Sequence, residues 1–274
     1  MATVSTEYPI GMDPVELDRL DRQGRRLAPA TRILFETAGI RPGMRVLDLG
    51  SGAGDVSLLV ADLVGSTGEV IGIDRSADAC ARAALRARQR GLHNLRFLVG
   101  DIQDAAPVDH VDAVVCRLVL MYQADPAAVL RAQATRLRPG GLVVPVELDV
   151  STARALPPTP LFGRAVGWLH TAMSRGSVQG TIGARLWAIA REAGLQPLGM
   201  LGVQPHFGPD DGQGMELFAG IVGALLPLIQ RTGAATAEEV GIESLERRLS
   251  DEVRAADSVF AHPLLMSAWA GAKG

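Results

Sequence analysis

Short apolar runs alternate with helical stretches between residues 46 and 148, and this alternation limits the possible folds more than any other feature. The apolar runs are 46–49, 69–74, 95–99, 113–116 and 142–148, and the helical stretches between them are 55–64, 76–90 and 126–137. A short, mostly apolar run is typical of a strand buried on both faces of a sheet. Because such strands joined by helices form βαβ units, the sequence predicts a Rossmann-like, doubly wound, mostly parallel α/β sheet.

The pattern changes after residue 149. Two further strands, at 195–203 and 258–269, would complete a seven-stranded sheet. Helices are expected at 161–173, 182–193, 215–230 and 237–256. Much of this region lies outside the alternation, so we interpret the segments at about 150–180 and 208–256 as helical cap insertions at the strand ends.

The N-terminal region is predicted to be helical. Asp13 offers an N-cap and Pro14 stands at the first helical position, and a rough apolar stripe continues to Leu27. A second helical stretch covers 30–38. We therefore divide the chain into a helical arm or lid (1–40), a Rossmann-like core (41–150), and a remainder that holds the last two strands and the cap (151–274).

Acidic and basic residues nearly balance. The chain has 27 basic and 30 acidic residues, which are scattered, and a formal net charge of −3. A nucleic-acid-binding chain carries a basic stripe and a high pI, so we expect no nucleic-acid partner. The arginines between residues 82 and 90 come nearest to such a stripe. We interpret them as the solvated face of a helix, with phosphate binding as the alternative.

The chain lacks the usual signals for export or membrane insertion. The longest uncharged apolar run, 217–229, is shorter than the roughly 20 residues of a membrane span. No cationic segment followed by an apolar one stands at the start. The two cysteines offer no disulfide framework, and we assign no metal site. By default we expect a cytoplasmic protein without a membrane partner.

A glycine-rich loop follows the first predicted strand. Gly50, Gly52 and Gly54 lead directly into the helix that begins at Asp55. Glycine allows positive φ and lets a ligand approach the backbone, and a helix N-terminus offers unpaired N–H groups. The dinucleotide-binding fingerprint is Gly-x-Gly-x-x-Gly, whereas here Asp55 stands in place of its third glycine. The spacing therefore argues against a dinucleotide.

Acidic residues mark three neighbouring strands. Asp48 precedes the glycine loop, Asp74 ends the second strand, and Asp101 follows the third. Asp74 can accept hydrogen bonds from two adjacent ribose hydroxyls. Asp101 can accept one from an exocyclic amine such as that of adenine, while the Ile102 N–H donates to the ring. Three carboxylates would repel a pyrophosphate but suit a sulfonium that carries an ammonium group.

These segments together resemble the class I S-adenosylmethionine-dependent methyltransferases. Residues 46–54 are similar to their glycine-rich motif, 70–74 to their ribose-binding strand, 100–102 to their adenine site, and 137–141 to their Leu-x-Pro-Gly-Gly turn. More loosely, the chain resembles bacterial small-molecule methyltransferases in Arg19 and Gln23, in 117–122 and in 267–269.

The resemblance implies S-adenosyl-L-methionine as the cofactor. The residues that it assigns to cofactor binding are Gln23, Asp48, Gly50, Ser51, Gly52, Gly54, Asp74, Arg75, Asp101, Ile102 and Arg117. Arg75 departs from the family, which usually packs an apolar side chain on the adenine face. A guanidinium can stack on a purine instead.

The acceptor side is less defined. The resemblance suggests in-line displacement, in which positioning contributes roughly 7–11 kcal/mol, so a general base is not required. For a hydroxyl acceptor, His170 or His206 could remove the proton. For an alkene carbon, Glu147 could stabilise a carbocation. Tyr8 and Tyr122 are candidates for contact with the acceptor. Each of these side chains could instead serve packing or the surface.

The apolar residues of 215–229 surround too much of a helix for one buried face. They could face a small, largely apolar acceptor or a second subunit of a homodimer, or they could be buried within the cap.

Two other classes of function compete with methyl transfer to an O, N or C atom. A cofactor-binding module or a cyclase would keep the motifs without transferring the methyl group. A short-chain oxidoreductase would need Tyr-x-x-x-Lys, which is absent because the tyrosines are Tyr8 and Tyr122 and the sole lysine is Lys273.

Overall fold

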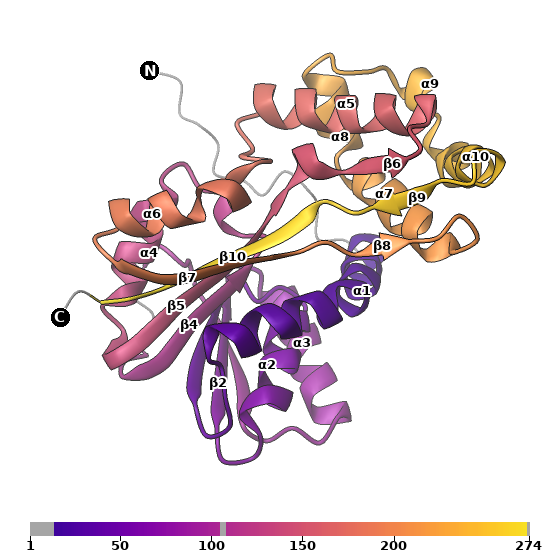
Figure 1. Cartoon of the computed structure of the whole chain (residues 1–274). Coiled ribbons are helices and arrows are strands. Elements are labelled where there is room, and N and C mark those ends of the chain that lie inside the picture. The colour runs from indigo at the N-terminus through magenta and orange to yellow at the C-terminus, as the bar shows by residue number, and fades with distance from the viewer. Residues whose placement is uncertain (1–13, 105–107, 273–274) are drawn as a thin grey trace. The chain divides into compact units, whose positions relative to one another are not determined.

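The computed structural model in Figure 1 describes residues 14–104 and 108–272, with side chains from residue 22 onward. The chain forms two compact units. Among the described residues, the large unit comprises 14–147, 183–203 and 265–272. The small unit comprises 148–182 and 204–264.

The large unit is built on a seven-stranded sheet. Its strands are β1 (Arg45–Leu49), β2 (Glu69–Asp74), β3 (Leu95–Val99), β4 (Val111–Arg117), β5 (Leu137–Asp149), β7 (Gln196–Val203) and β10 (Leu264–Gly271). They lie in the order β3-β2-β1-β4-β5-β10-β7. The first five form parallel pairs, and β10 pairs antiparallel with β7. The predicted Rossmann-like, mostly parallel sheet is confirmed.

Helices cover both faces of this sheet. They are α1 (Pro14–Ala38), α2 (Asp55–Val64), α3 (Ala77–Gln89), α4 (Pro126–Ala134) and α6 (Leu186–Glu192), with short 3-10 turns η1 (Leu120–Tyr122) and η3 (Ile182–Arg185). In Figure 1, α1, α2 and α3 lie on one face, and α4 and α6 lie on the other. Leu47, Ile71 and Val144 are fully buried between these layers, as two-sided burial of parallel strands requires.

The small unit joins a three-stranded antiparallel sheet to five helices. The sheet has the order β6 (Arg154–Leu156), β9 (Val259–Ala261), β8 (His206–Phe207). The helices are α5 (Pro160–Arg175), α7 (Gly212–Ala224), α8 (Leu226–Arg231), α9 (Ala237–Val240) and α10 (Ile242–Ala255), and a 3-10 turn η2 covers Val150–Thr152. An aromatic cluster forms the core: Phe162 stacks on Phe218 with ring centroids 4.4 Å apart, and Phe260 lies 5.1 Å from Phe162.

Several predicted elements are divided differently in the structure. The N-terminal region is one helix that contains Pro29, which lies on the exposed face where the carbonyl it leaves unpaired can meet water. The helix expected at 237–256 is two helices, because Gly241 adopts a left-handed conformation with φ of 54°. The strand expected at 258–269 is β9 and β10, separated at His262 and Pro263.

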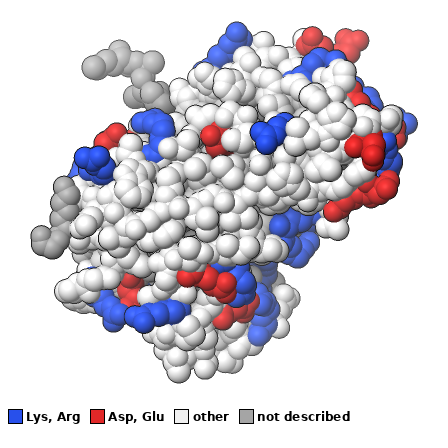
Figure 2. Space-filling model, in the orientation of Figure 1, with Lys and Arg blue, Asp and Glu red and all other residues white. Residues whose placement is uncertain are grey.

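Helix hydrophobicity and the distribution of surface charge are relevant to the predicted absence of membrane and nucleic-acid partners. No helix in the described part of the chain is both long and apolar enough to cross a membrane. On the face shown in Figure 2, basic and acidic side chains are interspersed.

Candidate cofactor site

The glycine loop connects the carboxyl end of β1 to α2. Gly52 has a φ of 52°, and a Cβ built on it would meet no atom within 4 Å, so its backbone borders open space. Gly54 has a φ of 91°, and a Cβ there would lie 2.9 Å from the Cβ of Ala83 on α3. Gly52 therefore leaves the loop open to a ligand, and Gly54 lets α3 approach it closely.

Asp74 ties the end of β2 to this loop. Its Oδ2 accepts a hydrogen bond of 2.8 Å from the Gly52 N–H, and its Oδ1 accepts one of 2.9 Å from the Ser76 N–H. The Asp74 carbonyl accepts a hydrogen bond of 2.9 Å from the Gly100 N–H. The ends of β1, β2 and β3 are thus joined through one residue, which is half-buried and leaves lone pairs on its carboxylate for hydroxyl donors.

Asp101 and Ile102 follow β3 in a tight turn. The exposed Asp101 accepts a hydrogen bond of 2.9 Å from the Gln103 N–H, and Ile102 is buried. The buried Gln133 of α4 donates its side-chain N–H to the Ile102 carbonyl. The turn is therefore held from α4 as well as by its own bonds.

Asp48 is enclosed beneath the loop. Its Oδ2 accepts a hydrogen bond of 2.6 Å from the Ser57 hydroxyl on α2. Burial raises the pKa of Asp48 to about 7, and the Ser57 hydrogen bond and the charge of Arg117 oppose the rise. Burial lowers the pKa of Arg117, whereas the negative charges of Asp55 and Asp48 raise it. Arg117 donates a hydrogen bond of 3.1 Å to the Thr31 hydroxyl, which links β4 to α1.

Glu147 holds the segment that follows β4. Its side chain is fully buried in β5, and its Oε1 accepts hydrogen bonds from the N–H groups of Val119 (2.9 Å) and Leu120 (2.7 Å). Leu118 has a φ of 57°, which turns the chain so that Val119 lies against Gly50. A Cβ on Gly50 would be 2.7 Å from Val119 Cγ2. Glu147 therefore positions a side chain on the glycine loop.

The sequence is similar to those of known methyltransferases. A family model described as a methyltransferase domain matches residues 40–172. A 2-phytyl-1,4-naphtoquinone methyltransferase of Synechococcus elongatus is 40% identical over 111 residues, which cover 40% of this chain and 48% of that protein. A ubiquinone/menaquinone biosynthesis C-methyltransferase (UbiE) of Shewanella baltica is 33% identical over 120 residues, which cover 43% of this chain and 48% of that protein. The chain contains a class I S-adenosylmethionine-dependent methyltransferase domain, and the family model matches it over residues 40–172.

The likeness to solved structures concerns the fold. The crystal structure of a SAM dependent methyltransferase from Aquifex aeolicus has a TM-score of 0.53 and 19% identity, over 69% of this chain and 92% of that one. The curated relatives match over about half of their own length. The residues matched by the family model, 40–172, include the glycine loop, Asp74 and Asp101.

The residues of the methyltransferase domain fit S-adenosylmethionine. Gly52 borders open space, and Asp74 offers carboxylate lone pairs at the adjacent strand end. Two buried oxygens of the loop region, Asp48 Oδ1 and Ser51 Oγ, have no hydrogen-bond partner among the described residues. Polar atoms of this kind are satisfied when a ligand or water supplies the missing donor or acceptor.

The other predicted site residues lie in different places. In the large unit, Gln23 is half-buried on α1, Arg75 is exposed after β2, and Tyr122 is half-buried in η1. In the small unit, His170 is exposed on α5, and His206 is exposed on β8. The Nδ1 of His206 lies 2.9 Å from the Gln204 carbonyl oxygen.

One predicted site residue lies outside the described part of the chain, and three residues that support the site have no signal in the sequence. Tyr8 lies outside the described residues. Sequence reasoning did not single out Thr31, Ser57 or Gln133, because each acts through another residue, 86, 9 and 31 positions away, and has no local motif. In the described ranges, no group of three or more His, Cys, Asp or Glu side chains converges to hold a metal ion.

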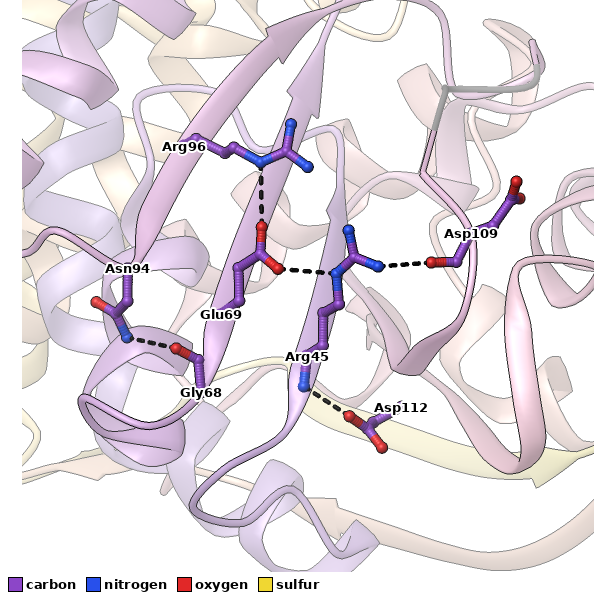
Figure 3. Close-up of polar contacts among 7 residues, drawn as sticks. All are labelled: Arg45, Gly68, Glu69, Asn94, Arg96, Asp109 and Asp112. Atoms are coloured by element: carbon purple, nitrogen blue, oxygen red, sulfur yellow. Dashed lines mark hydrogen bonds and ion pairs between the residues drawn. The ribbon is translucent and has the colours of Figure 1, made fainter.

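A network of polar contacts lies at the amino ends of the strands, opposite the glycine loop (Figure 3). It is formed by Arg45, Glu69, Arg96, Asp109 and Asp112. Glu69 pairs with Arg45 Nε at 2.8 Å and with Arg96 Nε at 3.1 Å. Arg45 also donates its side-chain N–H to the Asp109 carbonyl and its backbone N–H to Asp112, both at 2.7 Å. This network lies where the strands begin, and the acidic group beside the glycine loop, Asp74, lies at the carboxyl end of β2.

Proposed function

We propose that the chain transfers the methyl group of S-adenosylmethionine to an O, N or C atom of a small, largely apolar molecule. The observation that supports the proposal is the hydrogen bond of 2.8 Å from the Gly52 N–H to Asp74, which holds a carboxylate beside an open glycine loop within the methyltransferase domain. We propose that this carboxylate binds the ribose. The two curated relatives, named as quinone methyltransferases, support an apolar acceptor.

The bound cofactor supplies an electrophilic methyl group on a sulfonium. The chain binds and orients it: Asp74 accepts from the ribose hydroxyls, and Asp101 with the Ile102 N–H meets the adenine edge. The buried Asp48 and the loop glycines are proposed to surround the amino acid part. Because in-line transfer depends on positioning, these contacts can account for most of the rate enhancement.

The candidate catalytic residues differ in their surroundings. Glu147 is fully buried and already accepts two backbone N–H groups, which favours a positioning role over contact with the acceptor. His170 and His206 are exposed and stay our candidates for the proton acceptor if the methylated atom is a hydroxyl. Tyr122, on the turn after β4, is proposed to contact the acceptor.

Binding of the demethylated product, S-adenosylhomocysteine, tests the cofactor site. We expect a calorimetric signal for the wild-type protein, and a loss of affinity of about tenfold or more for Asp74→Ala, since a hydrogen bond to a charged group is worth about 1.5–3 kcal/mol. Asp62→Ala, an exposed carboxylate on α2, is the matched control and should bind normally. Silence of the wild-type protein toward both forms of the cofactor would overturn the proposal.

Methyl transfer needs a separate experiment. The protein is incubated with methyl-labelled cofactor and a panel of demethylated quinones, phenols and alkenes, and product is followed by mass spectrometry. We expect label in an apolar acceptor only when active protein is present. Rearranged but unlabelled product, or binding without turnover across the panel, would favour the cyclase or the non-transferring module instead.

A further inference from the structure

Arg86 bridges the end of the glycine loop from the neighbouring helix α3. Its Nη1 donates a hydrogen bond of 2.6 Å to the Ala53 carbonyl, and its Nη2 donates one of 2.8 Å to Asp55 Oδ1. Ala53 lies within the loop and Asp55 begins α2, so one guanidinium spans the Gly54 peptide. The sequence predicts that the arginines of 82–90 form a solvated helix face. For Arg86 that interpretation is wrong, because its side chain is only 20% exposed.

The surroundings enclose this contact on two sides. Ala83, one helical turn before Arg86, lies so close that Gly54 has no room for a Cβ. On the other side, the backbone of Gly24 in α1 packs on the Asp55 carboxylate, since a Cβ at Gly24 would be 2.7 Å from either carboxylate oxygen. The Asp55 side chain is 14% exposed. A charge-assisted pair shielded in this way resists competition from water.

The loop needs such a restraint because of its glycines. Glycine loses more backbone freedom on ordering than any other residue, so a loop with three of them would sample many conformations. Asp74 holds the loop at the Gly52 N–H, and Arg86 holds it at the Ala53 carbonyl. The two contacts restrain adjacent residues of the loop, Gly52 and Ala53, from two different elements.

We propose that Arg86 is a positioning residue for cofactor binding, which keeps the glycine loop in its binding conformation without touching the cofactor. Ligand affinity falls in proportion to the fraction of molecules that hold the binding-competent conformation. A planar guanidinium reaches the carbonyl and the carboxylate at once, whereas a lysine ammonium is a single point charge. Arg86→Met should therefore lose both contacts, and Arg86→Lys should keep part of them.

The chain provides a matched control on the same two helices. Arg90 Nη2 pairs with Asp62 Oδ2 at 2.9 Å, which also joins α3 to α2, but this pair is exposed and lies near the C-terminal ends of both helices, whereas the loop lies at the N-terminal end of α2. Arg90→Met should therefore remove an α2–α3 ion pair while it leaves the loop contacts in place.

The test is calorimetric titration of S-adenosylhomocysteine into the wild-type protein and the three variants, with folding checked by circular dichroism. We expect Arg86→Met to weaken binding about tenfold or more, Arg86→Lys to lie between it and the wild type, and Arg90→Met to stay within about twofold. In the free protein, hydrogen exchange at residues 52–55 should accelerate in Arg86→Met and not in Arg90→Met.

Unchanged affinity in Arg86→Met would overturn the proposal, as would an equal loss in Arg90→Met. If Arg86→Met fails to fold, an Arg86→Lys variant that folds and shows wild-type affinity and exchange overturns it, and one with weakened binding supports it. The inference rests on cofactor binding alone. Failure of the wild-type protein to bind would therefore count against the site itself, while wild-type binding with unchanged variants counts against Arg86 only.

Discussion

Replacement of Glu147 by glutamine should alter how stability depends on pH. Burial raises the pKa of Glu147 from 4.5 to about 7, although hydrogen bonds from the backbone of Leu120 and Val119 oppose the rise. Because the folded protein binds this proton more tightly than the unfolded chain does, the stabilisation is complete below pH 4.5 and disappears as the pH rises through about 7. At 1.36 kcal/mol for each pKa unit, the change amounts to roughly 3 kcal/mol.

Glutamine preserves the oxygen that accepts from the Val119 and Leu120 N–H groups and does not titrate. Chemical unfolding of wild type and Glu147→Gln should be measured between about pH 4.5 and 8. We expect the wild-type free energy of unfolding minus that of the variant to fall by up to roughly 3 kcal/mol across this range.

Glu239 supplies the control for this measurement. It is exposed, and a hydrogen bond from the Thr236 N–H lowers its pKa, so its stabilisation is present above the unfolded value of 4.5 and is lost only in more acidic solution. The difference between wild type and Glu239→Gln should therefore stay flat above about pH 5. A difference between wild type and Glu147→Gln that is equally flat would refute the reasoning.

Three other substitutions probe different parts of the molecule. Gly54→Ala should lower the free energy of unfolding by about 1–3 kcal/mol, measured in denaturant, because φ is 91° and the new Cβ would lie 2.9 Å from Ala83. Glu69→Gln weakens the charged network at partly exposed positions, so unfolding at low salt should show a loss of about 1 kcal/mol or less that shrinks in high salt. Burial lowers the pKa of His262 from 6.5 to about 4, so the stabilisation present above pH 6.5 is lost on acidification toward 4; thermal melts should show that His262→Asn lacks this dependence.

The parts of the fold that follow local rules could be predicted from the sequence. The apolar run that contains Leu47 becomes the buried strand β1, and the glycine at position 50 ends it. The apolar pattern and the glycine were therefore enough to predict this strand. Asp74 lies at the carboxyl end of β2 beside the glycine loop, because parallel strands present these ends at one edge of the sheet.

Other features depend on contacts between distant segments. Arg86 lies 31 residues from Asp55, and Glu147 lies 28 residues from Val119, so no window of sequence shows that either side chain is buried and paired. Their residue types even suggest the opposite, because Arg and Glu are usually exposed. The same holds for His262, which is fully buried with its Nδ1 2.7 Å from the Pro263 carbonyl oxygen, while the histidines chosen from the sequence are exposed.

The contacts of Asp74 are compatible with both its structural role and the proposed contact with the cofactor. Each of its oxygens accepts one backbone N–H, from Gly52 or from Ser76, and an ionised carboxylate oxygen can accept a second hydrogen bond. A ribose diol can therefore bind Asp74 while both backbone contacts persist. Since the loop does not have to reorganise, less binding free energy is lost to ordering. An asparagine here would place an amide N–H against one of the two backbone donors, and it would thus disturb the loop as well as the proposed ribose contact.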